Sequence, residues 1–394
     1  MTLPTSTERL LASINTSTFL KEFSFDKNQF RPSPGAEVEF ADGALWLKEH
    51  LVVFQIKERA QGADSDEQAL RQWFNQKVKR DGTRQIRSTL AYLRDNPSIL
   101  LTNAREHQFN VNTGQFKSVV SVVIYQPEHD VPEDCAVQKY HISTSTGDEI
   151  FVHIISLEDY SLICELLLTP IEIVQYFLFR EKYLRQFEAG ARKEKWLLGR
   201  FLMSPVVPEP SLDDAGRDCS KAVDNLQENL NCLEVRKFLE RMGEKWERGE
   251  RTDETEYYAV LIEFALLNRV GLSAFDERLK LAIRHASRDE PALPYSFEIP
   301  ERRIGYVVVS LTRERHPDRQ GYLVRLAELK MYERKLEKCA GVSVVFATDK
   351  VEIDWCYGEK PWSPNPEFER YLKENGSPFR KTRGQKVLMY GTKI

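Results

Sequence analysis

Two short apolar runs separated by a polar break lie near the N-terminus, at residues 40–47 and 51–56. Both runs are rich in Val, Leu, Phe and Trp, and the break consists of Lys48, Glu49 and His50. Strand-length runs of such residues joined by a short polar link are typical of a β-hairpin. The pattern therefore predicts two antiparallel strands in this segment.

Polar side chains interrupt the predicted hairpin. Because side chains alternate between the two faces of a strand, Gln55 and Lys57 share one face of the second strand. A turn near Glu49 places Asp42 opposite Ile56 or Lys57, within reach across the strands. Burying an acid, an amide and an amine without partners costs free energy. We therefore expect these side chains to form a site at the open end of the hairpin.

Metal-dependent hydrolysis would explain these residue types. The Asp42 carboxylate, the Gln55 amide oxygen and the Ile56 carbonyl are the hard oxygen ligands that suit Mg²⁺ or Mn²⁺. The amine of Lys57 would lower the pKa of a metal-bound water or stabilise the charge that grows on a phosphate. Glu39, three positions before Asp42, would assist from outside the ligand set or at a second metal.

The order Asp42, Gln55, Ile56, Lys57 resembles the D…(E/Q)xK signature of the PD-(D/E)xK nuclease superfamily, in the Gln-containing variant of Mrr-like restriction endonucleases. The resemblance covers about the first third of the chain. Gln55 stands where an acidic residue is more usual, and Ala41 replaces the Pro that often precedes the Asp. The resemblance implies an α/β (α+β) fold in which a mixed sheet is flanked by helices, and an endonuclease that hydrolyses phosphodiester bonds.

The elements that follow the hairpin have a compatible order. Residues 67–94 predict a long helix, bent or broken at Asp81 and Gly82, and residues 118–125 predict a strongly apolar strand. A helix, a hairpin, a second helix and a strand in this order fit a mixed sheet flanked by helices.

Candidate nucleic-acid contacts lie on this second helix. The resemblance implies that the helix presents a polar side chain to the site, with Gln85 as the candidate. The basic residues Lys77, Arg84 and Arg87 would follow a phosphate backbone. A helix face that is merely solvated is the alternative for all of them.

An acidic residue on the first helix is a further candidate. Related nucleases often carry an extra acidic ligand there, which suggests Glu8 or Glu22. The order Thr5 to Glu8 also fits a capping box, and we favour this structural role for Glu8. Similarly, His141 and His153 are expected to be structural residues of strands.

The remaining chain predicts accessory regions. We divide the chain into a nuclease core at residues 1–135, a hairpin with helices at 136–205 that is accessory to the core, a helical region at 206–295 and a C-terminal α/β region at 296–394. The last region contains a strand, a helix and a second strand, which predict a parallel pair.

Composition limits the class of protein. The 394 residues are 41% hydrophobic and 29% charged, with a formal net charge of −4, so nucleic acid would have to bind to local basic patches. The six Cys form no CxxC motif, which indicates a reducing compartment without a structural metal cluster. The sequence shows neither a signal-peptide core nor a membrane-spanning run. We expect a cytoplasmic protein without a membrane partner.

Together these features predict a Mg²⁺- or Mn²⁺-dependent endonuclease that acts on nucleic acid, with DNA favoured as the substrate. The resemblance associates such nucleases with prokaryotic restriction or anti-phage defence, as a homodimer or with a defence-system partner subunit. The alternative is a catalytically inactive nuclease fold that serves as a scaffold for nucleic acid or a partner protein. A further alternative is a C-terminal region that binds its own ligand and switches the N-terminal domain.

Overall fold

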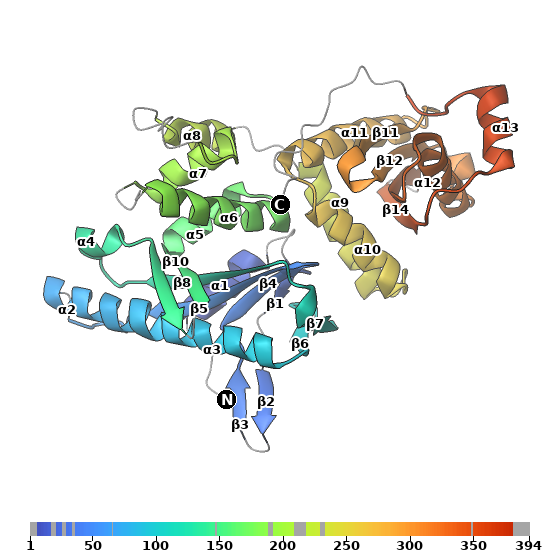
Figure 1. The fold of residues 1–394 in the computed structure, drawn as a ribbon. Coiled ribbons are helices and arrows are strands. Elements are labelled where there is room, and N and C mark those ends of the chain that lie inside the picture. The colour runs from blue at the N-terminus through green and yellow to red at the C-terminus, as the bar shows by residue number, and fades with distance from the viewer. Residues whose placement is uncertain are drawn as a thin grey trace. The chain divides into compact units, whose positions relative to one another are not determined.

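The computed structural model describes residues 6–16, 21–25, 29–33, 36–64, 66–145, 148–187, 192–208, 218–228, 233–347 and 350–380. The chain forms two compact units, Met1–Leu230 and Asn231–Ile394 (Figure 1). The four-part division predicted from the sequence is finer than these two units and stays a prediction. Residues 1–135 and 136–205 belong to one unit because both supply strands to the same sheet.

The elements of the first unit follow one another in this order: α1 (Ser6–Asn15), β1 (Ser24–Phe25), β2 (Gln29–Ser33), β3 (Ala36–Glu39), β4 (Gly43–Leu47), β5 (His50–Glu58), α2 (Glu67–Trp73), the π-helix η1 (Phe74–Asp81), α3 (Gly82–Asp95), β6 (Ser98–Thr102), β7 (Gln108–Asn112), η2 (Thr113–Gln115), β8 (Ser118–Gln126), α4 (Glu133–Ala136), β9 (Tyr140–Ser145), β10 (Asp148–Ser156), α5 (Leu157–Leu166), α6 (Pro170–Phe187), α7 (Glu194–Met203) and α8 (Ser220–Glu228).

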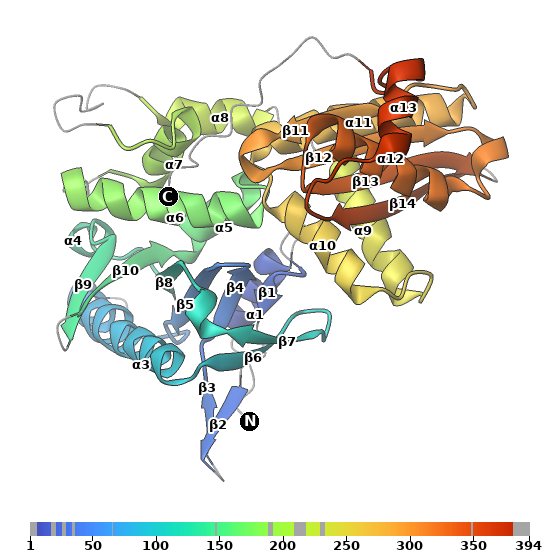
Figure 2. The same ribbon diagram turned by 45° about the vertical axis from the view of Figure 1, so that its right-hand side comes forward.

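The main sheet of this unit has six strands in the order β1-β4-β5-β8-β10-β9. The first three strands pair antiparallel, β5, β8 and β10 run parallel, and β9 returns antiparallel at the other edge. Helices cover both faces of the sheet, with α3 on one side and α6 on the other (Figures 1 and 2). The predicted α/β fold with a mixed sheet flanked by helices is confirmed.

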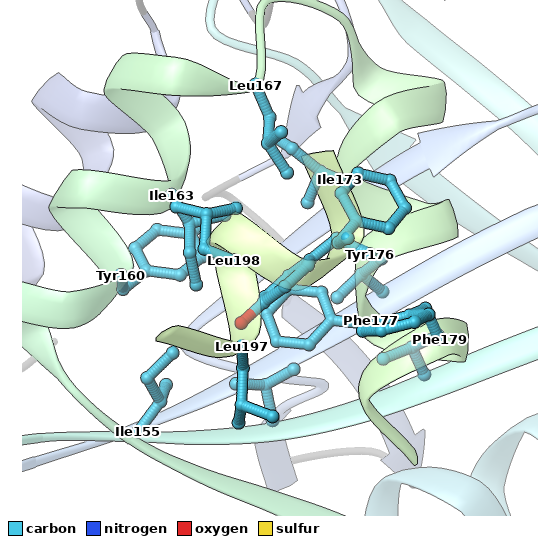
Figure 3. Packing of buried hydrophobic residues seen from close by; sticks show 14 of the residues in the cluster. Ile155, Tyr160, Ile163, Leu167, Ile173, Tyr176, Phe177, Phe179, Leu197 and Leu198 are labelled. Carbon is cyan, nitrogen blue, oxygen red and sulfur yellow. The ribbon is translucent and has the colours of Figure 1, made fainter. Parts of the chain in front are cut away.

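Each face of the sheet buries its own apolar core, because side chains alternate along the strands. Val52 and Phe54 of β5 contribute to the core beneath α5, α6 and α7, and Figure 3 shows the side chains that these helices supply to it. Leu51 and Val53 contribute to the core beneath α2, η1 and α3. Burial of each large apolar side chain contributes roughly 1.5–3 kcal/mol, so both helical layers are held firmly to the sheet.

The predicted hairpin is present as β4 and β5, but its register differs from the expected one. Leu47 pairs with His50 and Gly43 pairs with Phe54. By this register Asp42 lies opposite Gln55, whereas Ile56 or Lys57 was expected there. The turn contains two residues, Lys48 and Glu49, and Lys48 has a positive φ of 51°. The favoured two-residue hairpin turns require a positive φ at their first central residue, which Lys48 supplies.

The predicted long helix is also present, as the continuous run of α2, η1 and α3. The break expected at Asp81 and Gly82 is the point where the π-helix ends and the α-helix resumes. A Cβ atom on Gly82 would come within 2.9 Å of the Val123 side chain. Glycine therefore allows the helix to pass close to the sheet at this point.

The second unit contains α9 (Leu233–Glu247), α10 (Glu254–Ala265), α11 (Arg269–Ser287), β11 (Tyr295–Ile299), η5 (Pro300–Arg302), β12 (Ile304–Leu311), η6 (Arg313–Arg315), α12 (Arg319–Arg334), β13 (Lys338–Ala347), β14 (Lys350–Glu359) and α13 (Pro366–Asn375). Its sheet has the order β11-β12-β13-β14, and β12 and β13 form the predicted parallel pair. In the described part of the chain no single helix is long and apolar enough to span a membrane, although α10 and α11 pass that test as a pair bent by 117°.

Candidate active site

The candidate site lies where β5 extends beyond the start of β4. The antiparallel ladder begins at Gly43 and Phe54, so the backbone of Ile56 has no strand partner on that side. Instead, the N–H of Ile56 donates to Oδ2 of Asp42 at 2.5 Å, and the Nζ of Lys57 donates to the carbonyl of Ile56 at 2.7 Å. Side chains thus complete the backbone hydrogen bonds that a longer strand would have made.

Gln55 adds a buried oxygen to this end of the sheet. Its side chain is only 4% exposed, and among the described residues its Oε1 atom has no hydrogen-bond partner. Gln55 pairs with Val123 on β8, directly where Gly82 passes the sheet. A buried acceptor without a donor is costly, so this oxygen is available to a hydrogen-bond donor or a cation.

Burial changes the acidity of both charged groups. It raises the pKa of the Asp42 carboxyl above its usual value, and the N–H of Ile56 and the charge of Lys57 offset this only in part. Burial also lowers the pKa of Lys57, against the opposing charges of Asp42 and Asp81. Titratable groups displaced in this way are characteristic of functional sites.

Glu8 is a residue that the sequence analysis assigned to a different role. It lies in the first turn of α1, and its charge raises the pKa of both Asp42 and Lys57, which places it in their electrostatic environment. The resemblance did point to this position, because related nucleases often carry an extra acidic ligand on the first helix. Its expected capping partner, Thr5, lies outside the described residues. Glu22 instead forms a buried ion pair with Arg105.

The segment that carries Asp42 is fixed by α3. The hydroxyl of Thr89 donates to the carbonyl of Phe40 at 2.6 Å, and both groups are buried. Sequence reasoning missed Thr89, because a threonine inside a helix gives no sign of a distant backbone partner. Glu39 ends strand β3, but its side chain lies outside the part of the chain that is described.

The predicted nucleic-acid residues lie on the outer face of the helix. Lys77, Arg84, Gln85 and Arg87 are all exposed. The face of α3 that covers the sheet is formed instead by residues such as Ile86. The exposed position of Gln85 therefore differs from the expected one, in which it pointed toward the site.

The site shares its edge of the sheet with a cavity. Lys57, Tyr125 and Ser156 lie in one row, in register at the carboxyl ends of three parallel strands. Tyr125, Ser156 and Asp159 line a cavity of about 670 Å³. Ligands of open α/β sheets bind at the carboxyl ends of parallel strands, which is the location found here.

A second buried charge cluster lies on β10 and the helices above it. The fully buried Arg180 donates from Nε and Nη2 to the two oxygens of Glu194, at 2.7 and 3.1 Å, and from Nη1 to Nδ1 of His153 at 2.9 Å. Glu194 also accepts from the hydroxyl of Tyr176 and from Lys139. His153 therefore has a structural position. His141 lies on β9, where it pairs with Val152 of β10, so both histidines are strand residues as expected.

The donor set at the first cluster fits a hard metal ion. Within the described ranges, no three His, Cys, Asp or Glu side chains are grouped as a metal site of those residues would be. The carboxylate of Asp42, the Oε1 of Gln55, which has no hydrogen-bond partner among these residues, and the carbonyl of Ile56 would nevertheless offer oxygen ligands. Mg²⁺ typically takes only one or two carboxylates and keeps several waters.

Comparison of the chain with protein-family models, curated proteins and solved structures gives no match.

Proposed function

We propose that this protein is a metal-dependent nuclease that hydrolyses phosphodiester bonds in DNA. The observation that carries the proposal is that Asp42 and Lys57 both bond to the backbone of Ile56 at the end of β5, next to Gln55, whose buried Oε1 has no hydrogen-bond partner among the described residues. An acid and an amine placed beside an unfilled oxygen acceptor suit a metal-assisted reaction.

The roles of the residues follow from their positions. Asp42, Gln55 and the carbonyl of Ile56 would hold Mg²⁺ or Mn²⁺, which when bound polarises a phosphoryl oxygen and lowers the pKa of a bound water. Lys57, held by its hydrogen bond to Ile56, would stabilise the negative charge that develops on the phosphate. Because the ammonium is largely removed from water, its charge interacts more strongly than on the surface.

The fold supports the proposal. A helix, antiparallel strands that include β4 and β5, a long helix and a strand parallel to β5 follow one another in the order implied by the resemblance to PD-(D/E)xK nucleases. A role in restriction or anti-phage defence is a prediction that the resemblance alone carries.

A stripe of arginines offers a path for the substrate backbone. Arg84, Arg87 and Arg94 recur on one exposed side of α3, and Arg80 precedes them in η1. From Arg80 to Arg94 the stripe extends about 20 Å at the usual helical rise. Exposed arginines at this spacing can contact successive phosphates of one strand.

The test is cleavage of supercoiled plasmid DNA and of single-stranded RNA with Mg²⁺, Mn²⁺ or EDTA. We expect DNA cleavage that requires metal and that Lys57→Ala reduces by roughly 10²–10³-fold, the range found when a donor to developing charge is removed. Lys117→Ala is the matched control, because Lys117 is exposed and pairs with Glu49 at the opposite end of the hairpin. Equal cleavage by native protein and Lys57→Ala would contradict the assignment.

An inactive scaffold is the second candidate function. Gln55 favours it, because an amide at this position brings no negative charge to a metal site. A scaffold would bind DNA without cutting it under any of these metal conditions. The same set of measurements therefore separates the two functions.

A further inference from the structure

The carboxylate of Asp81 is surrounded by cations at the edge of the candidate site. The Nζ of Lys77 lies 3.2 Å from its Oδ2, while Nε of Arg80 and Nη2 of Arg84 lie 3.6 and 3.5 Å from its Oδ1. The Asp81 side chain is 15% exposed, whereas the three cations are 59–73% exposed. The carboxylate thus lies among three more exposed cations of the same helical run.

The position of Asp81 follows from the local backbone. It is the last residue of the π-helix η1, and the α-helix resumes at Gly82, where the chain passes close to Val123. π-Helical turns are rare and occur frequently at functional sites. Val123 pairs with Gln55, so the residue that follows Asp81 packs against the strand next to the candidate site. Asp81 therefore lies at the edge of that site.

A carboxylate and a phosphodiester offer the same features to a group of cations. Each carries a single negative charge shared over two exposed oxygens, and each is bound by Lys and Arg through charge-assisted hydrogen bonds. We propose that Asp81 occupies the place of a DNA backbone phosphate in the free protein, and that DNA displaces it from Lys77, Arg80 and Arg84. This inference rests on the proposed function, because it makes these cations part of the DNA path.

Competition between Asp81 and a DNA phosphate for these cations should weaken DNA binding. The three cations and Asp81 carry a formal net charge of +2, from three positive charges and one negative charge, and Asp81→Asn raises it to +3. The substitution retains the size of the side chain and removes the internal competitor. The phosphate would then bind cations that are already available to it.

The experiment measures binding of a short fluorescein-labelled DNA duplex in EDTA by fluorescence anisotropy, over a series of salt concentrations. For Asp81→Asn we expect a dissociation constant roughly 3–10-fold lower than that of native protein, with a slope against log salt that is steeper by about one. With metal present, KM should fall, because the phosphate no longer competes with Asp81 for these cations.

Glu181→Gln is the matched control. Glu181 pairs with Arg185 at 2.9 Å on α6, which covers the opposite face of the sheet. Its removal changes the net charge equally but should leave DNA binding unchanged. An equal gain in both variants, unchanged or weaker binding by Asp81→Asn, or no binding by any of the proteins would overturn the inference.

The outcomes also separate this inference from the proposed function. Tighter binding by Asp81→Asn in a protein that cleaves no DNA would support the phosphate-mimicking role and contradict the nuclease. Metal-dependent cleavage with the same KM in native protein and Asp81→Asn would support the nuclease and contradict the role of Asp81.

Discussion

The carboxylate of Glu194 accepts from Arg180, Tyr176 and Lys139, whereas the carboxylate of Asp42 accepts from one backbone N–H and has Lys57 nearby. Both clusters are largely buried in the same unit. Burial alone would raise both pKa values. At Glu194 the opposing charges outweigh burial and lower the pKa to about 2, while at Asp42 burial prevails and the pKa is raised.

The carboxylate of Glu194 is thus fully paired with opposite charges, whereas that of Asp42 is only partly compensated. In the Arg180 cluster, each charged group meets enough partners to repay its loss of hydration. In the Asp42 cluster, the Oε1 of Gln55 has no donor among the described residues, and the charged forms of Asp42 and Lys57 are both disfavoured by burial. Such incomplete compensation is costly for folding and is typical of a site that binds something else.

The largest effect is expected when the structural cluster is broken. Arg180→Met leaves Glu194 buried without its main partner and should lower the free energy of unfolding by about 3–5 kcal/mol. Urea unfolding followed by circular dichroism measures this loss. Arg185→Met, on the exposed side of the same helix, should cost less than about 1 kcal/mol. Similar losses in the two variants would contradict the structural role of the buried Arg180 pair.

The Asp42 cluster should respond in the opposite way. Asp42→Asn keeps an oxygen that can accept from the N–H of Ile56, so we expect the free energy of unfolding to change by less than about 1 kcal/mol. DNA cleavage should nevertheless fall by roughly 10²–10³-fold, because the ligand charge is lost. Parallel cleavage assays and urea unfolding test both parts. A variant that unfolds readily but cleaves normally would assign Asp42 to structure.

The stability of the protein should depend on pH through His153, which contacts Arg180 in the second cluster. Burial and the charge of Arg180 hold the pKa of His153 well below 6.5, so below pH 6.5 the unfolded chain takes up a proton that the folded protein does not. Stability should therefore fall as pH decreases from 6.5 toward the folded pKa, by up to about 1.4 kcal/mol per pH unit. Urea unfolding at pH 7.5, 6 and 5 measures the slope, and His153→Gln should reduce it. An identical slope in the variant would contradict the role of His153.

The smallest effect concerns the support of Asp42. Thr89→Val removes the hydroxyl that donates to the carbonyl of Phe40 and should cost about 1 kcal/mol of stability. Because Phe40 lies two residues before Asp42, we also expect a several-fold loss of cleavage, measured as kcat. Ser88→Val changes an exposed neighbour on the same helix and serves as the control. Full activity in Thr89→Val would show that Asp42 needs no support from α3.

The sequence predicted the parts of this arrangement that depend on local pattern. Two strand-length apolar runs joined by a short polar break revealed the hairpin that carries Asp42 and Lys57, and helical periodicity revealed the run that becomes α2, η1 and α3. The register was wrong by at least one residue, because it depends on a two-residue turn with a positive φ at Lys48. Such a conformation is rare for a lysine and leaves no mark in the apolar pattern.

Contacts between distant segments could not be predicted in this way. The hydrogen bond from Thr89 to Phe40 and the pairing of Arg180 with Glu194 join residues that no periodicity connects. The surroundings of Asp81 were also missed, since its π-helical turn is not encoded in a simple spacing of apolar residues. These features arise from tertiary contacts, which override local preferences.

Binding of Mn²⁺ tests the contrast between the two clusters most directly. Isothermal titration calorimetry would compare native protein, Asp42→Asn and Glu181→Gln, each checked for native circular dichroism. We predict saturable Mn²⁺ binding by native protein and Glu181→Gln, with an affinity at least about tenfold lower in Asp42→Asn. Equal Mn²⁺ binding by all three proteins, or no binding by native protein, would contradict the account of Asp42, Gln55 and Ile56 as a metal site.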